Sequence, residues 1–160
     1  MTIAQKLNRY LTDHRAEYEI IAHMPTRSSI ETARICHVPA RQMVKAVLLD
    51  TDQDYLLAVL PANRRLELGE LSSGLGPNPH LVDEEELAII FDDCAVGAIP
   101  ALASGYGVKT MVDDSLDDQA DVYFEAGDHA SLIHMSGAEF SRLTEQTQRG
   151  HFSNASSPMH

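Results

Sequence analysis

The sequence predicts a mixed α+β domain, with helices packed over a mostly antiparallel or mixed sheet. Helical and strand-like patterns follow one another irregularly along the 160 residues, which is the order expected of this class. Two consecutive apolar, β-branched runs separated by three residues favour an antiparallel hairpin. No GxGxxG follows the first strand, so a doubly wound dinucleotide-binding fold is not predicted.

The first third of the chain contains two predicted helices with a strand between them. Apolar side chains recur at helical spacing over residues 2–14. Residues 18–24 alternate like a short strand. A second helix over 27–38 begins with a capping-box spacing, in which Glu31 follows Ser28 by three positions.

The hairpin comes next, and shorter elements complete the predicted domain. Its strands cover residues 43–50 and 54–62. We expect one domain over residues 1–147 and a disordered polar tail over 148–160. The later elements are a short helix over 64–76, a helix over 82–91 with Asp83 as its cap, a glycine-rich loop over 97–108, strands over 109–116, 121–127 and 130–137, and a closing helix over 137–147.

Composition suggests a cytoplasmic, reduced protein. No apolar run approaches the ~20 residues of a membrane span, the first residues lack the apolar centre of a signal peptide, and two cysteines are too few for a disulfide framework. The net charge is −12, but residues 1–65 hold nine Lys and Arg against seven Asp and Glu. A polyanion would therefore meet the first part of the chain. An acidic enzyme without a macromolecular partner explains the charge equally well.

Lys45 is the residue that fits its surroundings least. It lies between Val44 and Ala46 in an apolar run that predicts a buried strand. Burying an ammonium is costly unless an anion pairs with it. Lys45 either lies at a strand end and reaches out to water, or points into a cleft to hold a phosphate, a carboxylate or a developing negative charge.

Three other positions have residue types that suit a binding site. The loop from Gly97 to Pro100 combines bare amides with a fixed bend, which can grip an anion or a carbonyl oxygen. His129 follows a glycine turn and could bind a substrate or transfer a proton, and Asp113 is a further candidate ligand. An ordinary turn, a surface histidine and a capping aspartate are the alternatives.

Two other kinds of chemistry receive little support. Cys94 precedes the glycine loop and could be a nucleophile, but a small apolar cysteine after IIFDD is more often part of a core. The eight histidines show no HxxxH spacing, and there is no CxxC, P-loop or GxSxG motif. No metal or cofactor is predicted.

The order of the short motifs is more specific than any one of them. This series resembles the YbaK family, which includes the editing insertion domain of bacterial prolyl-tRNA synthetase and its free-standing relatives, over roughly residues 18–142. The motifs are H-M-P-T (23–26), T-A (32–33), V-K-A-V-L-L (44–49), L-L-A-V-L-P-A-N-R-R-L (56–66), D-C-A-V-G-A-I-P (93–100) and Y-F-E-A-G-D-H (123–129).

The resemblance implies a free-standing aminoacyl-tRNA deacylase with a mixed sheet that is partly rolled into a barrel and surrounded by helices. Lys45 matches the functional lysine of the family, Gly97 to Pro100 match its glycine–proline loop, and His129 matches a histidine found in some members. The loop departs from the members closest to YbaK, which have a longer glycine-to-proline spacing with a serine before the proline. Which amino acid is removed, among alanine, serine, threonine and cysteine, therefore stays open.

A hypothesis for the site follows from this resemblance. The amides of Gly97 and Ala98 contact the ester carbonyl, and Lys45 holds the terminal phosphate or the ester region. Substrate contacts are expected from His23, Thr26, Ile99, Pro100, Asp113 and His129, and tRNA contacts from Arg27, Arg41, Arg64 and Arg65.

The expected partners are a mischarged tRNA and, in one version, an aminoacyl-tRNA synthetase, with neither a membrane nor DNA. A module that binds an aminoacyl or nucleotide ligand without turnover, or that docks on a synthetase, is the alternative from another functional class.

Overall fold

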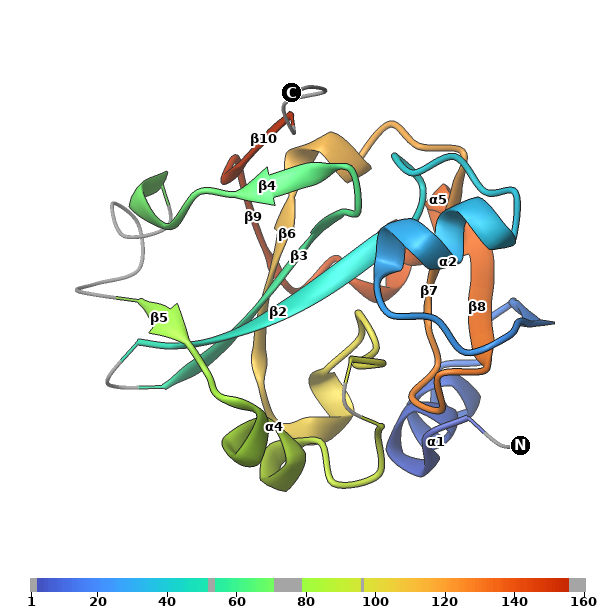
Figure 1. Cartoon of the computed structure of the whole chain (residues 1–160), viewed down its shortest axis with the longest axis horizontal. Helices are drawn as coiled ribbons and strands as arrows, with labels where there is room; N and C mark the ends of the chain where they lie inside the picture. The colour runs from blue at the N-terminus through green and yellow to red at the C-terminus, as the bar shows by residue number, and fades with distance from the viewer. Residues whose placement is uncertain (1–2, 52–53, 71–78, 96, 156–160) are drawn as a thin grey trace.

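The computed structural model describes residues 3–51, 54–70, 79–95 and 97–155, and its strands form two main sheets with helices around them (Figure 1). The helices are α1 (Gln5–Asp13), α2 (Ser29–Ile35), α4 (Glu84–Ile90) and α5 (Gly137–Leu143), with single 3₁₀ turns at η1 (Ser104–Tyr106) and η2 (Asp114–Leu116). The strands are β1 (Glu19–Ala22), β2 (Val44–Asp50), β3 (Tyr55–Pro61), β4 (Arg64–Leu66), β5 (His80–Leu81), β6 (Lys109–Asp113), β7 (Asp121–Glu125), β8 (Ser131–Ser136), β9 (Gln148–Gly150) and β10 (Ser153–Ala155).

The larger sheet is mixed, and the smaller one is antiparallel. The larger has the order β5-β2-β3-β6-β9, in which β2 and β3 are antiparallel while β6 runs parallel to both β3 and β9. The smaller has the order β1-β8-β7, and β4 pairs with β10 in a separate ribbon. A parallel bridge between Met43 and Tyr123 brings the start of β2 beside β7. Within the described residues the sheets do not close into a barrel, but the predicted α+β class is confirmed.

The main core lies between the two sheets and is closed by α1 and α5. Strand β2 contributes Val44 and Leu48 to it, and β7 contributes Val122 and Phe124. The opposite face of β2 carries Lys45. Side chains alternate along a strand, so this second face is distinct from the one that fills the core.

Local sequence signals explain several of the element boundaries. The Ser28 hydroxyl accepts a hydrogen bond from the Glu31 amide at 3.2 Å, as the capping-box spacing predicts. Asp83 caps α4 in the same way by accepting from the Glu86 amide at 2.9 Å. The predicted hairpin is also confirmed, with Lys45 opposite Leu60.

Two predictions about single segments are corrected by the structure. Residues 64–66 form strand β4 where a helix was expected, since they pair with β10; residues 68–70 are helical, and 71–78 lie outside the described residues. The tail was expected to be disordered from residue 148, yet 148–150 and 153–155 are strands β9 and β10. Residues 156–160 lie outside the described part.

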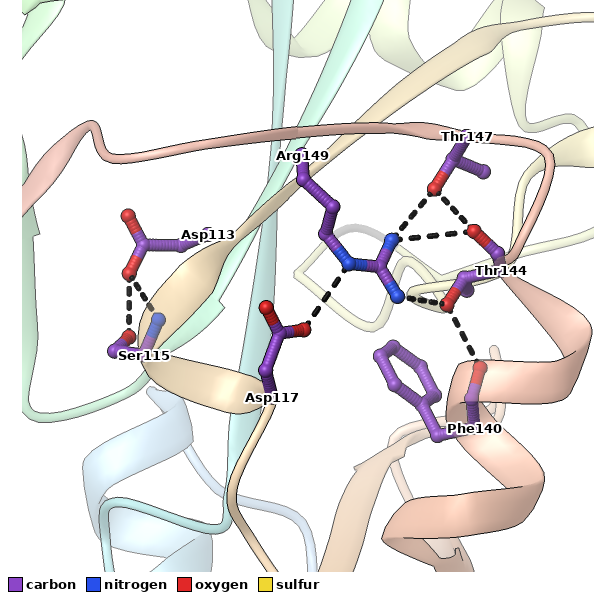
Figure 2. Close-up of polar contacts among 7 residues, drawn as sticks. All are labelled: Asp113, Ser115, Asp117, Phe140, Thr144, Thr147 and Arg149. Carbon is purple, nitrogen blue, oxygen red and sulfur yellow. Dashed lines mark hydrogen bonds and ion pairs between the residues drawn. The ribbon is translucent and has the colours of Figure 1, made fainter.

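One buried aromatic ring and the polar contacts of Arg149 hold this C-terminal segment, residues 148–155. Phe152 is 1% exposed and packs in a small cluster with Leu60. Arg149 donates to the Asp117 carboxylate at 3.0 Å and to the Thr144 carbonyl at 3.1 Å, so its guanidinium ties the segment to the end of α5 (Figure 2). A polar sequence with a single large apolar residue gives no periodic signal, which is why the segment was missed.

No described helix has both the length and the apolar character needed to cross a lipid bilayer.

Candidate functional site

Lys45 is half-buried on the second face of β2, between two small apolar clusters. Met43 belongs to one of these clusters and Leu49 to the other. Burial lowers the pKa of the Lys45 ammonium, and no ion pair joins it to a carboxylate of a described residue. A partly desolvated cation without a partner gains free energy when an anion binds next to it. The geometry therefore suits an anion-binding role.

The glycine–proline loop exposes one residue only. Gly97 is exposed and has φ of +85°, a conformation that L side chains rarely adopt. Ala98 is fully buried, and its amide donates to the Ala95 carbonyl at 3.1 Å. Ile99 packs against the main core and Pro100 is buried. The amide of Ala98 is thus already used, and the expected oxyanion contact is left to Gly97.

The turn between β7 and β8 carries His129 to this loop. The amide of Ala95 donates to the Gly127 carbonyl at 2.7 Å, which ties the loop to the turn. A Cβ on Gly127 would lie 2.6 Å from Ala4 Cβ, so the turn packs closely on the start of α1 and only glycine fits there. A Cβ built on Gly97 would lie 3.2 Å from Cε1 and Nε2 of His129. The imidazole edge therefore faces Gly97.

A buried acid–base cluster lies beside this turn. The side chains of His23 and Glu125 are 1% and 6% exposed, and His23 Nε2 is 3.3 Å from Glu125 Oε1. The hydroxyl of Thr32 is 3.4 Å from Glu125 Oε2 and 2.5 Å from the hydroxyl of Thr26. Burial raises the pKa of the Glu125 carboxyl, while the charges of His23 and His129 act in the opposite direction.

His23 and Thr26 were expected to line the substrate site directly. The structure places His23 behind the surface, in contact with Glu125, and Thr26 in contact with Thr32. The buried imidazole of His23 supports the site from behind, whereas Thr26 is half-buried. Direct contact of either residue with a substrate stays a prediction.

The register of the bridged strands relates Lys45 to this cluster. Lys45 on β2 and Glu125 on β7 each lie two residues beyond the Met43–Tyr123 bridge. The amide of Tyr123 also donates to the Gln42 carbonyl at 2.9 Å. The strands that carry the lysine and Glu125 thus lie side by side at the junction of the two sheets.

Asp113 is buried near the end of β6 and already has hydrogen-bond partners. It is 0% exposed, and its carboxylate accepts from the Phe152 amide at 2.9 Å. The same carboxylate accepts from the hydroxyl and amide of Ser115 (Figure 2). Burial alone would raise the pKa of this carboxyl, but hydrogen bonds from Ser115, Phe152 and Ser153 hold the pKa below its usual value. Asp113 therefore anchors the C-terminal segment, and its expected contact with a substrate stays a prediction.

The four arginines expected to contact tRNA differ in their surroundings. Arg27 and Arg41 are exposed, and Arg65 is exposed with Glu67 3.7 Å away. Arg64 is half-buried, and donates to the hydroxyl and the carbonyl oxygen of Ser153 at 2.7 and 2.8 Å. Arg64 therefore holds β10 against β4, while the other three remain accessible.

The described residues give little support to Cys94 as a nucleophile or to a metal site. Burial raises the pKa of the Cys94 thiol to about 12, so it is not a thiolate at neutral pH. Asp113, Asp114 and His151 have ligand atoms within 4.8 Å of one another. Asp113 is already hydrogen-bonded, and the exposed Asp114 and His151 pair with each other at 3.1 Å, so the three ligand atoms are engaged within the chain.

Sequence analysis missed Glu125 and Thr32 as site residues. Glu125 stands between Phe124 and Ala126 in an apolar strand, which is the same anomaly that singled out Lys45. Applying that criterion to every strand would have found it. Thr32 gives no such signal, because a threonine inside a helix is unremarkable.

Comparison with known proteins gives one family and several solved structures. A family model described as "Aminoacyl-tRNA editing domain" matches residues 23–143. The crystal structure of the hypothetical protein APE2540 is similar with a TM-score of 0.84 at 20% identity, covering 94% of this chain and 100% of that chain. A protein described as "a putative trans-editing enzyme for prolyl tRNA synthetase" is similar with a TM-score of 0.81 at 19% identity, covering 95% and 97% of the two chains.

A longer chain from Marinobacter aquaeolei VT8, described as "a Putative signal transduction protein", is also similar. Its TM-score is 0.76 at 23% identity, and the match covers 92% of this chain but only 30% of that one. Identities this low show a shared fold alone. The comparison with curated proteins found no match.

Proposed function

The chain belongs to the aminoacyl-tRNA editing domain family, and on that premise we propose that it is a trans-editing hydrolase. Its substrate would be a mischarged tRNA, from which it removes a small amino acid by hydrolysing the ester to the 3′-terminal adenosine. The observation that carries this proposal is the extent of the family match, which includes Lys45, Gly97, Glu125 and His129.

The chemistry needs few protein groups, because an aminoacyl ester is already activated. Hydrolysis requires a positioned water and a donor for the oxyanion that forms at the carbonyl. Gly97 is an exposed residue and its amide would be that donor, while Lys45 supplies a cation for the terminal phosphate or the ester region. The vicinal ribose hydroxyl of the substrate orients the water, so no protein nucleophile is needed.

The tRNA would approach over the part of the chain that contains most of its cations. Arg27 and Arg41 are exposed and close in sequence to Lys45, whereas residues 66–160 carry three Lys and Arg against seventeen Asp and Glu. Such a distribution favours phosphate contacts near the site and disfavours them elsewhere. The complex is expected to be weak and salt-sensitive.

The test is deacylation of Ala-, Ser-, Thr- and Cys-charged tRNAs at low salt by wild type, Lys45→Ala and Lys109→Ala. Lys109 is an exposed lysine on β6 that pairs with Asp54 at 3.1 Å, so it is a matched control. We expect wild type and Lys109→Ala to release one of the amino acids, and Lys45→Ala to be slower by roughly 100-fold, the cost of losing one charge-stabilising donor.

Two outcomes would contradict the proposal. Full activity of Lys45→Ala would remove the lysine from the site. No release of any amino acid by wild type, alone or with a synthetase added, would favour a binding module without turnover.

A further inference from the structure

The contact between His23 and Glu125 requires a shared proton. His23 Nδ1 is 2.7 Å from the Met24 carbonyl oxygen, which can only accept, so Nδ1 bears the hydrogen of that bond. The other nitrogen, Nε2, is 3.3 Å from Glu125 Oε1. An unprotonated Nε2 and an ionised carboxylate would repel each other at this distance. One proton therefore belongs to the pair, either on the imidazole or on the carboxyl.

This pair is connected to His129 through the backbone. The amide of His23 donates to the Ala130 carbonyl at 2.8 Å, and Glu125 ends the strand that leads into the turn. The turn is fixed further by Asp128, whose carboxylate accepts from the Ala130 amide at 2.9 Å. His129 itself has φ of +61°, a conformation that a non-glycine residue keeps only when its surroundings hold it.

The charge of His129 also acts on Glu125. Among the causes that offset the effect of burial on the Glu125 carboxyl are the charges of His23 and of His129. The groups that face this carboxylate come from three elements: His23 after β1, Thr32 and Cys36 on or next to α2, and His129 in the β7–β8 turn. Both imidazoles thus act on the Glu125 carboxyl.

We propose that Glu125, with His23, is a positioning residue for the editing reaction that acts through His129. The pair keeps the edge of the His129 imidazole at Gly97, the place where the ester carbonyl would lie. Glu125 is too deeply buried to touch the substrate, so its effect is indirect. The inference rests on the proposed function. It adds that the protonation of the His23–Glu125 pair controls the position of His129, a role that neither the family description nor the sequence pattern assigns.

A dependence on pH follows from the shared proton. With one proton the pair is neutral overall. A second proton, taken up as the pH falls, makes the pair positive, and an uncompensated charge buried behind the turn that carries His129 is costly. The deacylation rate should therefore fall on the acid side as the pair takes up its second proton.

The first part of the test does not depend on activity. ¹⁵N NMR of the histidine side chains in the free wild-type protein should show a proton on His23 Nδ1 across pH 5 to pH 8. A bare Nδ1, with hydrogen only on Nε2, would overturn the shared-proton arrangement. This measurement needs no variant, so it stays decisive even if replacing Glu125 prevents folding.

The second part compares the pH dependence of kcat for wild type, Glu125→Gln and Glu139→Gln. Glu139 is a carboxylate on α5 that pairs with Arg142 at 2.7 Å, so Glu139→Gln is the control. We expect Glu125→Gln to lower kcat about 10-fold at neutral pH and to remove or displace the acid limb of the profile. A folded Glu125→Gln with the wild-type profile, or one lowered equally at every pH, would overturn the positioning role.

Failure of the proposed function looks different from failure of this inference. Without any deacylation by wild type, the editing proposal fails and the positioning role fails with it, whereas the NMR result still tests the His23 tautomer on which the shared proton depends.

Discussion

Polar side chains are bonded differently in two regions of the molecule: the junction of the two sheets, and the C-terminal segment (148–155) with the residues that hold it, called the anchor below. In the anchor, Asp113, Arg149 and Arg64 each have two or more hydrogen bonds to groups of the same chain. At the junction, Lys45 is half-buried with no ion pair to a described carboxylate, and Gly97 is an exposed residue. Polar groups satisfied within the chain stabilise a fold. Those that the chain leaves unsatisfied are available to a ligand.

Lys45 on β2 and Glu125 on β7 show the same contrast between a side chain with partners in the chain and one without an ion pair to a described carboxylate. Lys45 and Glu125 both interrupt apolar strands, and both lie two residues beyond the Met43–Tyr123 bridge. Glu125 has His23 and Thr32 as partners, whereas the one cause acting on the pKa of Lys45 is burial. The same anomaly in sequence therefore corresponds to an internal support in one case and to a candidate ligand contact in the other.

The largest effect on stability is expected from the apolar part of the anchor. Phe152→Ala should lower the free energy of unfolding by about 3–5 kcal/mol, as for other fully buried aromatic residues. Chemical denaturation would measure it, with Leu81→Ala as the control because Leu81 is 62% exposed. A loss below about 1 kcal/mol would mean that the segment is not packed as described, and the contrast between the two regions would be lost.

A smaller effect, with a defined pH dependence, is expected from the polar part of the anchor. Asp113→Asn should cost about 1–3 kcal/mol at pH 7, because buried donors lose a charged acceptor. The pKa of this carboxyl is lower in the folded state, so its contribution is present above the unfolded value of about 3.9 and is lost as the pH falls through the folded value.

The cost of Asp113→Asn should accordingly shrink below about pH 4. The control is Asp114→Asn, an exposed neighbour that pairs with His151 at 3.1 Å. Unfolding measured from pH 7 down to pH 3 would decide it. An equal cost at all pH values would show that the charge of Asp113 does not contribute.

Sequence predicted the elements that have a repeated pattern and missed those held by single contacts. The hairpin follows from two apolar runs, and the caps Ser28 and Asp83 follow from their spacing. Strand β10 depends on one ring, Phe152, and on Asp113 thirty-nine residues earlier. No local pattern records such a partnership, so the tail was predicted to be disordered.

The same limit applies to the candidate site. Lys45 and Gly97 are anomalies that can be read one residue at a time. The link of His23 to Glu125 joins positions 102 residues apart, and the burial of Ala98 and the engagement of its amide depend on how the loop folds. Those features required the structure.

The smallest expected effect is on tRNA binding, and it distinguishes two arginines that were both predicted from the sequence to contact tRNA. Arg41→Ala, on the exposed surface just before β2, should weaken tRNA binding a few-fold and lower the slope of log affinity against log salt by about 1, since one phosphate contact is lost. Arg64 already donates to Ser153 in the anchor. Arg64→Ala should therefore lower the free energy of unfolding and leave the slope unchanged. Binding of charged tRNA measured from 50 to 200 mM salt would show it, and an equal change in slope for both variants would place Arg64 on the tRNA surface after all.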